Sequence, residues 1–205
     1  MRFLIADDHA VVRKGLAQIL REEFSDGEIK EVINSNEAYS EARKNNWDVI
    51  LMDISMPGRN GIEVLKQIRA DNIKTPILIL SMYPEDQYAL RALKAGASGF
   101  LNKETATEEL LIAIRKVLSG RKYISSSVAE MLAETPVEKP THEVLSDREM
   151  QVFQLIALGK AVSEIAQEMS LSVNTISTYR TRILDKLNLN NNSEITRYAI
   201  EYKLI

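Results

Sequence analysis

Short apolar runs alternate with amphipathic segments over the first 120 residues of the chain. The apolar runs predict five strands, over residues 2–6, 29–34, 49–52, 76–80 and 99–101. Each run precedes a segment with apolar residues at helical spacing, and these segments predict helices over about 12–20, 36–45, 62–70, 85–95 and 105–118. Strands that are apolar on both faces are typical of a parallel sheet between helix layers. Five such repeats predict an α/β fold with a five-stranded doubly wound parallel sheet.

From residue 144 onward the pattern is helical only. Ser146 and Glu149 form a capping-box pattern at the start of an apolar-periodic segment, as Thr105 and Glu108 do before the last helix of the first domain. A short helix, a three-residue turn and a longer helix over 173–187 follow, and a fourth helix is expected over 192–202. This part therefore predicts a small all-α domain of four helices.

The predicted domains are 1–122 and 144–205, with a linker over 123–143. The linker interpretation rests on three consecutive serines and on Pro136 and Pro140, which break regular structure. A short helical patch over 128–133 interrupts this segment.

Composition excludes several classes of protein. With 45% hydrophobic and 27% charged residues, the chain is neither disordered nor collagen-like. Cysteine is absent, which excludes disulfides and thiolate metal sites. No apolar run approaches the roughly 20 residues of a membrane helix, and no secretory leader is visible, so we expect a cytoplasmic protein without a membrane partner. A net charge of −3 means that any contact with nucleic acid must be local.

Polar side chains follow four of the predicted strands at their carboxyl ends, where the functional crevice of a doubly wound sheet lies. They are Asp7, Asp8, Asp53, Ser81 and Lys103. Three neighbouring carboxylates repel one another unless a cation neutralises them, and oxygen ligands favour Mg²⁺. An aspartate can act as a covalent nucleophile while a lysine and a metal ion stabilise transferring charge. One such aspartate would be an ordinary solvated loop residue, but the whole set predicts phosphoryl chemistry.

Residues 1 to about 122 resemble the receiver domain of two-component response regulators, a flavodoxin-like fold. The resemblance is carried by Ile5-Ala6-Asp7-Asp8-His9, by Met52-Asp53-Ile54-Ser55-Met56-Pro57 with Gly61, by Leu80-Ser81 and by Lys103 after Gly99-Phe100-Leu101.

The resemblance implies a role for each of these positions. Asp53 would be the phospho-acceptor, and the phosphoryl oxygens would bind Ser81 and Lys103. Asp8 would bind Mg²⁺ directly, Asp7 mostly through water, and Ser55 through its backbone carbonyl. Phe100 would be the switch aromatic that turns inward when phosphate draws the Ser81 hydroxyl. From the residues alone, an ordinary core aromatic is an equally good interpretation of Phe100.

Three further residues near the site need an interpretation. Met82 stands where many receivers have a small residue, which predicts a partly roofed site, and Glu104 stands where many have proline. His9 is adjacent to the acids, and we interpret it as a solvated residue at a helix start rather than as a phosphorelay site.

The short helix, turn and longer helix form a helix-turn-helix pattern, in which the second helix enters the major groove of DNA. On the longer helix, polar and basic side chains are candidates for contacts with base edges and phosphates. They are Asn174, Ser177, Thr178, Arg180, Thr181, Arg182 and Lys186. A packing helix with a solvated polar face fits this pattern equally well.

A second resemblance favours DNA binding. Leu145-Ser146-Asp147-Arg148-Glu149, Glu164-Ile165-Ala166 and Thr175-Ile176-Ser177-Thr178-Tyr179-Arg180 are similar to the LuxR-type DNA-binding domain, over residues 144–205. Together the two parts resemble the NarL/FixJ class of response regulators. The resemblance implies that the longer helix reads DNA and that the last helix dimerises the domains, through Glu194, Ile195, Tyr198 and Tyr202.

The domain departs from the family pattern mainly in charge. Ser177 stands where a basic residue is frequent and Tyr179 where histidine is frequent, and the domain has no basic excess. Affinity per monomer should therefore be modest and salt-dependent, so that dimerisation is needed for two half-sites. Ala161 stands where a capping Ser or Thr is usual, which predicts fraying of the short helix.

These observations favour a phosphorylation-regulated transcription factor. A sensor histidine kinase would donate the phosphoryl group to Asp53 with Mg²⁺, and double-stranded DNA and a second copy of the chain would be the other partners. Its only catalysis would be its own phosphorylation and slow dephosphorylation. A Mg²⁺-dependent phosphohydrolase is one alternative, although its usual acids lie two residues apart after the first strand and no cap domain is visible. A scaffold whose helix-turn-helix binds protein is another.

Overall fold

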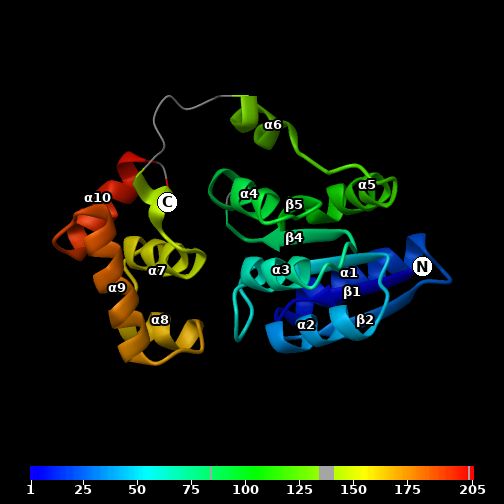
Figure 1. Cartoon of the computed structure of the whole chain (residues 1–205), viewed down its shortest axis with the longest axis horizontal. Coiled ribbons are helices and arrows are strands. Elements are labelled where there is room, and N and C mark those ends of the chain that lie inside the picture. The colour runs from blue at the N-terminus through cyan, green and yellow to red at the C-terminus, as the bar shows by residue number, and fades with distance from the viewer. Residues whose placement is uncertain (84, 134–140, 203) are drawn as a thin grey trace. The chain divides into compact units, whose positions relative to one another are not determined.

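The computed structural model describes residues 1–83, 85–133, 141–202 and 204–205 (Figure 1). The chain forms two compact units, Met1–Thr135 and Pro136–Ile205. No helix of the described residues is long and apolar enough to span a membrane.

The first unit is built on a five-stranded parallel sheet. Its strands are β1 (Arg2–Ala6), β2 (Glu28–Val32), β3 (Val49–Asp53), β4 (Ile77–Ser81) and β5 (Gly99–Asn102), in the order β2-β1-β3-β4-β5. All residues of the inner strands β3 and β4 are buried, whereas the edge strand β2 alternates between exposed and half-buried positions until the buried Val32. The predicted fold class is confirmed, and β2 lies one to two residues earlier than expected.

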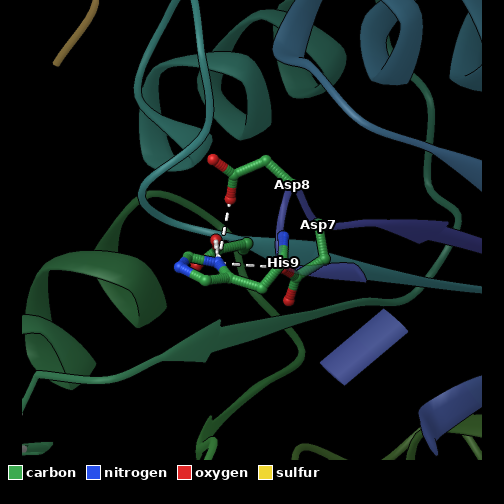
Figure 2. Close-up of side chains that lie close together, drawn as sticks. Asp7, Asp8 and His9 are labelled. Atoms are coloured by element: carbon green, nitrogen blue, oxygen red, sulfur yellow. Dashed lines mark hydrogen bonds and ion pairs between the residues drawn. The ribbon is translucent and has the colours of Figure 1, made fainter. Parts of the chain in front are cut away.

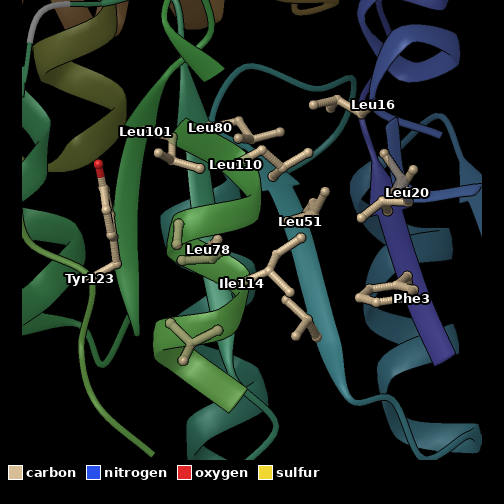
Figure 3. Packing of buried hydrophobic residues seen from close by; sticks show 14 of the residues in the cluster. Phe3, Leu16, Leu20, Leu51, Leu78, Leu80, Leu101, Leu110, Ile114 and Tyr123 are labelled. Atoms are coloured by element: carbon tan, nitrogen blue, oxygen red, sulfur yellow. The ribbon is translucent and has the colours of Figure 1, made fainter. Parts of the chain in front are cut away.

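Five helices follow the five strands. They are α1 (Ala10–Glu23), α2 (Ser35–Lys44), α3 (Gly61–Ala70), α4 (Glu85–Lys94) and α5 (Ala106–Leu118). The chain moves from β1 to one edge of the sheet at β2 and then in the opposite direction through β3 and β4 to β5. Because parallel crossovers are right-handed, this reversal places α1 on the opposite face of the sheet from α2, α3 and α4. The core in Figure 3 shows α5 on the α1 face, where Leu20 and Ile114 pack with Leu51 and Leu78 from alternate strand positions.

The start of α5 differs from the prediction. Thr105 has helical backbone angles (φ −98°, ψ −6°), and its side chain makes no cap hydrogen bond. Its hydroxyl donates instead to the carbonyl of Asn102 at 3.4 Å. The predicted capping box is therefore wrong here, because a cap residue needs extended angles to reach the third amide of the helix. A capping box does form at α3, where Asn60 and Glu63 bond each other's backbone N–H.

The segment after α5 contains a further helix, α6 (Ser126–Ala133), within the first unit. It packs against α4, and the hydroxyls of Ser125 and Ser127 donate to Glu85 at the start of α4. This part of the predicted linker is therefore helical and docked. Residues 134–140, which include both prolines of the prediction, lie outside the described residues.

The second unit is helical. It contains the 3₁₀ helix η1 (Thr141–Val144) and the helices α7 (Asp147–Ala157), α8 (Val162–Glu168), α9 (Val173–Leu187) and α10 (Asn192–Glu201). Helix α7 contacts both α9 and α10, and α8 contacts α9. The capping box of Ser146 and Glu149 forms as predicted. At Ala161 the backbone N–H donates to Glu164 at 2.6 Å, which anchors the first turn of α8 without a cap hydroxyl.

Candidate functional site

The carboxyl ends of β1, β3 and β5 bring a lysine between two buried aspartates. Lys103 Nζ lies 2.8 Å from Asp7 Oδ2 and 2.8 Å from Asp53 Oδ2, and none of the three side chains is more than 2% exposed. Burial raises the pKa of Asp53, and the negative charge of Asp7 adds to this rise, while Lys103 opposes it. Lys103 therefore offsets part of the effect of burial on this carboxyl, whose pKa still lies above its ordinary value.

Asp8 and His9 complete the cluster on its solvent side. His9 Nδ1 lies 2.9 Å from Asp8 Oδ1 and 3.2 Å from Asp7 Oδ1 (Figure 2). The same atom lies 3.8 Å from Asp53 Oδ2. The ring precedes α1 and makes no cap hydrogen bond. The side chain is 54% exposed, as expected for a residue at a helix start, but its Nδ1 faces all three acids. Sequence reasoning missed this placement, although the position of His9 directly after two acids at a strand end was a signal for it.

The cluster has the donor set for a hard divalent cation. Ligand atoms of Asp7, Asp8, His9 and Asp53 all lie within 4.8 Å of one another. The cluster gathers three carboxylates, whereas Lys103, which contacts Asp7 and Asp53, supplies one ammonium, so a negative excess is left for a cation to neutralise. Ser55 lies beside them, since its backbone N–H donates to Asp53 Oδ1 at 3.2 Å. These residues fit a metal ion whose ligands are mainly oxygen atoms.

The two predicted switch residues lie in neighbouring strands of the same sheet. Ser81, at the end of β4, is 1% exposed and its hydroxyl accepts the backbone N–H of Tyr83 at 2.9 Å. Phe100 lies in β5 and is 2% exposed, so its ring is turned inward. Met82 is 55% exposed, so any roof that it forms over the site is partial.

Glu104 is accommodated by the turn that follows Lys103. Its backbone N–H donates to Asn102 Oδ1 at 2.9 Å. Proline has no N–H to make this bond, so the turn as it stands uses a backbone donor that proline would lack.

Helix α9 presents a polar face to solvent. Asn174, Ser177, Thr178, Thr181 and Arg182 are all exposed, as predicted. Asn174, Thr178 and Arg182 line a hollow together with Thr175 and Tyr179. The hydroxyls of Thr178 and Thr181 donate to helix carbonyls one turn earlier, at 2.9 and 3.1 Å. Their oxygens are therefore positioned mainly to accept hydrogen bonds.

Two basic residues of α9 are turned to other parts of their own domain. Lys186 Nζ lies 2.6 Å from Glu149 Oε2 and donates to the carbonyl of Val144 at 3.3 Å. Arg180 Nε donates to Asn192 Oδ1 at 2.6 Å, at the start of α10. The ammonium of Lys186 joins α9 to the start of α7 while its side chain stays 39% exposed, and its phosphate contact stays a prediction.

Helix α10 holds the four predicted dimer residues in different environments. Ile195 is fully buried, so it cannot contact a second copy while the domain is folded. Glu194 is engaged at the helix start, where it accepts the backbone N–H of Asn190 at 2.8 Å. Tyr198 and Tyr202 stack with ring centroids 4.4 Å apart, and Tyr202 is 45% exposed. Ile200, which the sequence analysis did not select, is 63% exposed.

Comparison with known families defines the class of protein. Residues 3–115 match the response regulator receiver domain, and residues 143–199 match the luxR family of bacterial regulatory proteins. The chain therefore belongs to the response regulator family and combines a receiver domain with a LuxR-type DNA-binding domain. It is a DNA-binding transcription regulator controlled by phosphorylation, in which a histidine kinase supplies the phosphoryl group. Members of this class are transcription factors rather than conventional enzymes such as phosphohydrolases.

Particular relatives match over almost the whole chain. The response regulator UvrY of Escherichia coli K12 is 36% identical over 98% of this chain and 94% of its own. The oxygen regulatory protein NreC of Staphylococcus haemolyticus is 34% identical over 100% and 99%. Among solved structures, RcsB of Salmonella typhimurium has a TM-score of 0.59 at 28% identity, with 97% of both chains covered. An RcsB–DNA complex has a TM-score of 0.58 at 28% identity, covering 97% of this chain and 96% of that one.

Proposed function

We propose that Asp53 is the phospho-acceptor and that its phosphorylation controls how α9 engages DNA. The observation that carries this proposal is the buried bridge of Lys103 between Asp7 and Asp53, with the Ser81 hydroxyl at the end of the neighbouring strand β4. A reacting carboxylate and two groups suited to phosphoryl oxygens thus share one edge of the sheet.

Each side chain has a distinct task in the transfer. A bond from an Asp53 oxygen to phosphorus forms as the phosphorus–nitrogen bond of the kinase's phosphohistidine breaks, and the imidazole takes the electron pair. Lys103 favours the ionised form of Asp53 before the transfer and binds a phosphoryl oxygen after it. Asp8, Asp7, Asp53 and the Ser55 carbonyl would hold Mg²⁺. When bound, Mg²⁺ neutralises the acids and supplies Lewis-acid stabilisation of the transferring charge.

Phosphorylation then acts through Ser81. Its Oγ accepts the backbone N–H of Tyr83 in the structure, whereas its O–H would donate to a phosphoryl oxygen. Turning the side chain towards phosphate moves Oγ away from Tyr83 and shifts a two-state equilibrium of the receiver. Phe100 is the packing group of this switch.

We further propose that the DNA-binding domain works as a pair of copies, each on one half-site. Asn174, Ser177, Thr178 and Thr181 would contact base edges or phosphates, and Arg182 a phosphate. The RcsB–DNA complex supports DNA as the ligand, since its fold extends over 97% of this chain. The exposed Tyr202 and Ile200 of α10 are the candidate dimer contacts. Because the DNA of a bacterium lies in its cytoplasm, we propose that the chain acts there.

The decisive experiment is the intact mass of the full chain after incubation with acetyl phosphate and Mg²⁺, with light scattering on the same samples. We expect one phosphoryl group on the wild type, none on Asp53→Asn, and a shift towards dimer only where phosphate is present. Asp26→Asn, which removes an exposed carboxylate remote from the cluster, is the matched control. Incorporation into Asp53→Asn at the wild-type rate would move the acceptor elsewhere.

A further inference from the structure

We propose that Ser35 is a positioning residue for the cation site, because it fixes the loop between β3 and α3 that carries Ser55. This inference rests on the proposed function, in which the Ser55 carbonyl is a metal ligand. Ser35 is the first residue of α2 and is 1% exposed, yet its position in the sequence is remote from every acid of the cluster.

Three hydrogen bonds join Ser35 to the loop. Its backbone N–H and its hydroxyl both donate to the carbonyl of Pro57, at 3.2 and 3.1 Å. The hydroxyl oxygen in turn accepts the backbone N–H of Arg59 at 2.7 Å. The first amides of a helix have no partner within the helix, so the start of α2 can offer one to the loop. Ser35 therefore holds the backbone on both sides of Gly58.

Gly58 shows how closely this contact is fitted. Its φ is +96°, in the region that disfavours side chains, and a Cβ built there would lie 2.4 Å from Ser35 Oγ. A residue with a side chain at this position would have to displace the hydroxyl. The approach of the loop to α2 thus requires both the glycine and the serine.

The contact holds the part of the loop that is not otherwise buried. At its base, Gly61 N–H donates to the carbonyl of Ile54 at 2.9 Å, and Ser55 N–H donates to Asp53 Oδ1 at 3.2 Å. Met56 is 4% exposed, whereas residues 57–59 are exposed. The exposed tip gains no apolar burial, so polar contacts such as those of Ser35 have to order it.

A loosened tip would act on the cation through the backbone. The Ser55 carbonyl is two residues from Pro57. If the backbone at the tip can move, the direction in which that carbonyl points also becomes variable. Ordering it again on binding has an entropic cost, which weakens the affinity for the cation. Groups that orient metal ligands have effects of about 10–100-fold on affinity. Because only one ligand is involved here, we expect about a tenfold loss.

The test is a titration of the full chain with MgCl₂, followed by the backbone amide chemical shifts of residues 7, 8 and 53–55. The variant is Ser35→Ala and the control is Ser98→Ala. Ser98 also accepts a backbone N–H through its hydroxyl, from Ile77 at 3.3 Å, but at the opposite end of β4 from Ser81. We expect the Kd for Mg²⁺ to rise about tenfold in Ser35→Ala and to stay within about twofold of wild type in Ser98→Ala.

Acetyl phosphate kinetics provide a second readout. In Ser35→Ala the half-saturating Mg²⁺ concentration should rise by the same factor, and the maximal rate should return to the wild-type value in excess Mg²⁺. A change in the maximal rate with unchanged Mg²⁺ dependence would overturn the proposal. An unchanged Mg²⁺ affinity of Ser35→Ala would overturn it as well. If the wild type itself binds no Mg²⁺, the proposed cation site fails and the role of Ser35 with it.

Gly58→Ala tests the same contact from the side of the loop. Its added methyl group should also raise the Kd for Mg²⁺, since it meets the Ser35 hydroxyl. In the double variant the hydroxyl is gone, so the combined effect should be smaller than the product of the two single effects. If the Kd of the double variant rises by the full product of the two single effects, within error, the two residues act independently. That result would contradict the proposal.

Discussion

The separate environments of two cations on α9 lead to a quantitative prediction about DNA binding. Arg182 is exposed beside the hollow lined by Asn174 and Thr178, and it makes no ion pair with any described residue. Lys186, one turn further on, is paired with Glu149. Arg182→Ala should therefore remove a phosphate contact, whereas Lys186→Ala should leave the DNA interface intact.

The expected magnitude follows from counterion release. Each phosphate contact contributes about 0.9 to the slope of log affinity against log salt concentration. Because two copies bind two half-sites, Arg182→Ala should reduce the magnitude of this slope by about 1.8. When the salt concentration rises fourfold, from 50 to 200 mM, both proteins lose affinity for DNA. The factor by which the wild type loses affinity should be about 12 times larger than the factor for the variant. Lys186→Ala should keep the wild-type slope but lose about 1 kcal/mol of stability, since Glu149 loses an ionic partner.

Fluorescence anisotropy with a labelled duplex of about 30 base pairs measures these slopes, and no operator sequence is needed because phosphate contacts are independent of sequence. The phosphorylated full chain and both variants are titrated at several salt concentrations, and urea unfolding gives their stabilities. An unchanged slope for Arg182→Ala would place Arg182 outside the interface. A reduced slope for Lys186→Ala would mean that the ion pair opens on DNA, and would refute the assignment of its ammonium to α7.

Two further predictions concern stability. Lys103→Met leaves the carboxylates of Asp7 and Asp53 buried without a cation. Urea unfolding should therefore show that the free energy of unfolding falls by about 3 kcal/mol and that added Mg²⁺ partly restores it. A fall of less than about 1 kcal/mol would contradict the buried bridge. Burial tends to raise the pKa of Glu149, but hydrogen bonds from Lys186 and Ser146 outweigh it and lower the pKa below the usual 4.5. The resulting stability is present above about pH 4.5 and is lost as the pH falls through the lowered value, so Glu149→Gln should flatten the stability profile in that acid range.

The sheet and its site could be predicted because both depend on periodicity. The apolar runs of β3 and β4 are buried at every position, and strands of that kind occur in parallel sheets. Once the strands are parallel, their carboxyl ends coincide, and Asp7, Asp53 and Lys103 follow without any knowledge of side-chain geometry.

Contacts between elements could not be predicted in this way. A helical wheel correctly places Arg182 and Lys186 on the outer side of α9. It describes one helix only, so it cannot show a contact between α9 and α7. The contact of Lys186 with Glu149 joins positions that are 37 residues apart in the sequence. The same limit applies to Ser35, whose importance depends on the loop at Gly58 rather than on any motif of its own. Capping patterns fail for a related reason, since Thr105 enters its helix from a tight turn that already fixes its backbone angles.

The electrostatics of Asp53 show why the site needs all of its parts. The proposed phosphoryl transfer requires an ionised Asp53, yet burial raises the pKa of Asp53 and so favours the neutral acid. Exposure to water would remove that difficulty, but it would also screen the charges that stabilise the transferred phosphoryl group. Lys103 offsets part of this rise within the buried site, because its ammonium lies 2.8 Å from the carboxylate. Asp7 and Asp8 add negative charge that Lys103 alone does not balance, and this excess is the physical reason to expect a divalent cation beside Asp53.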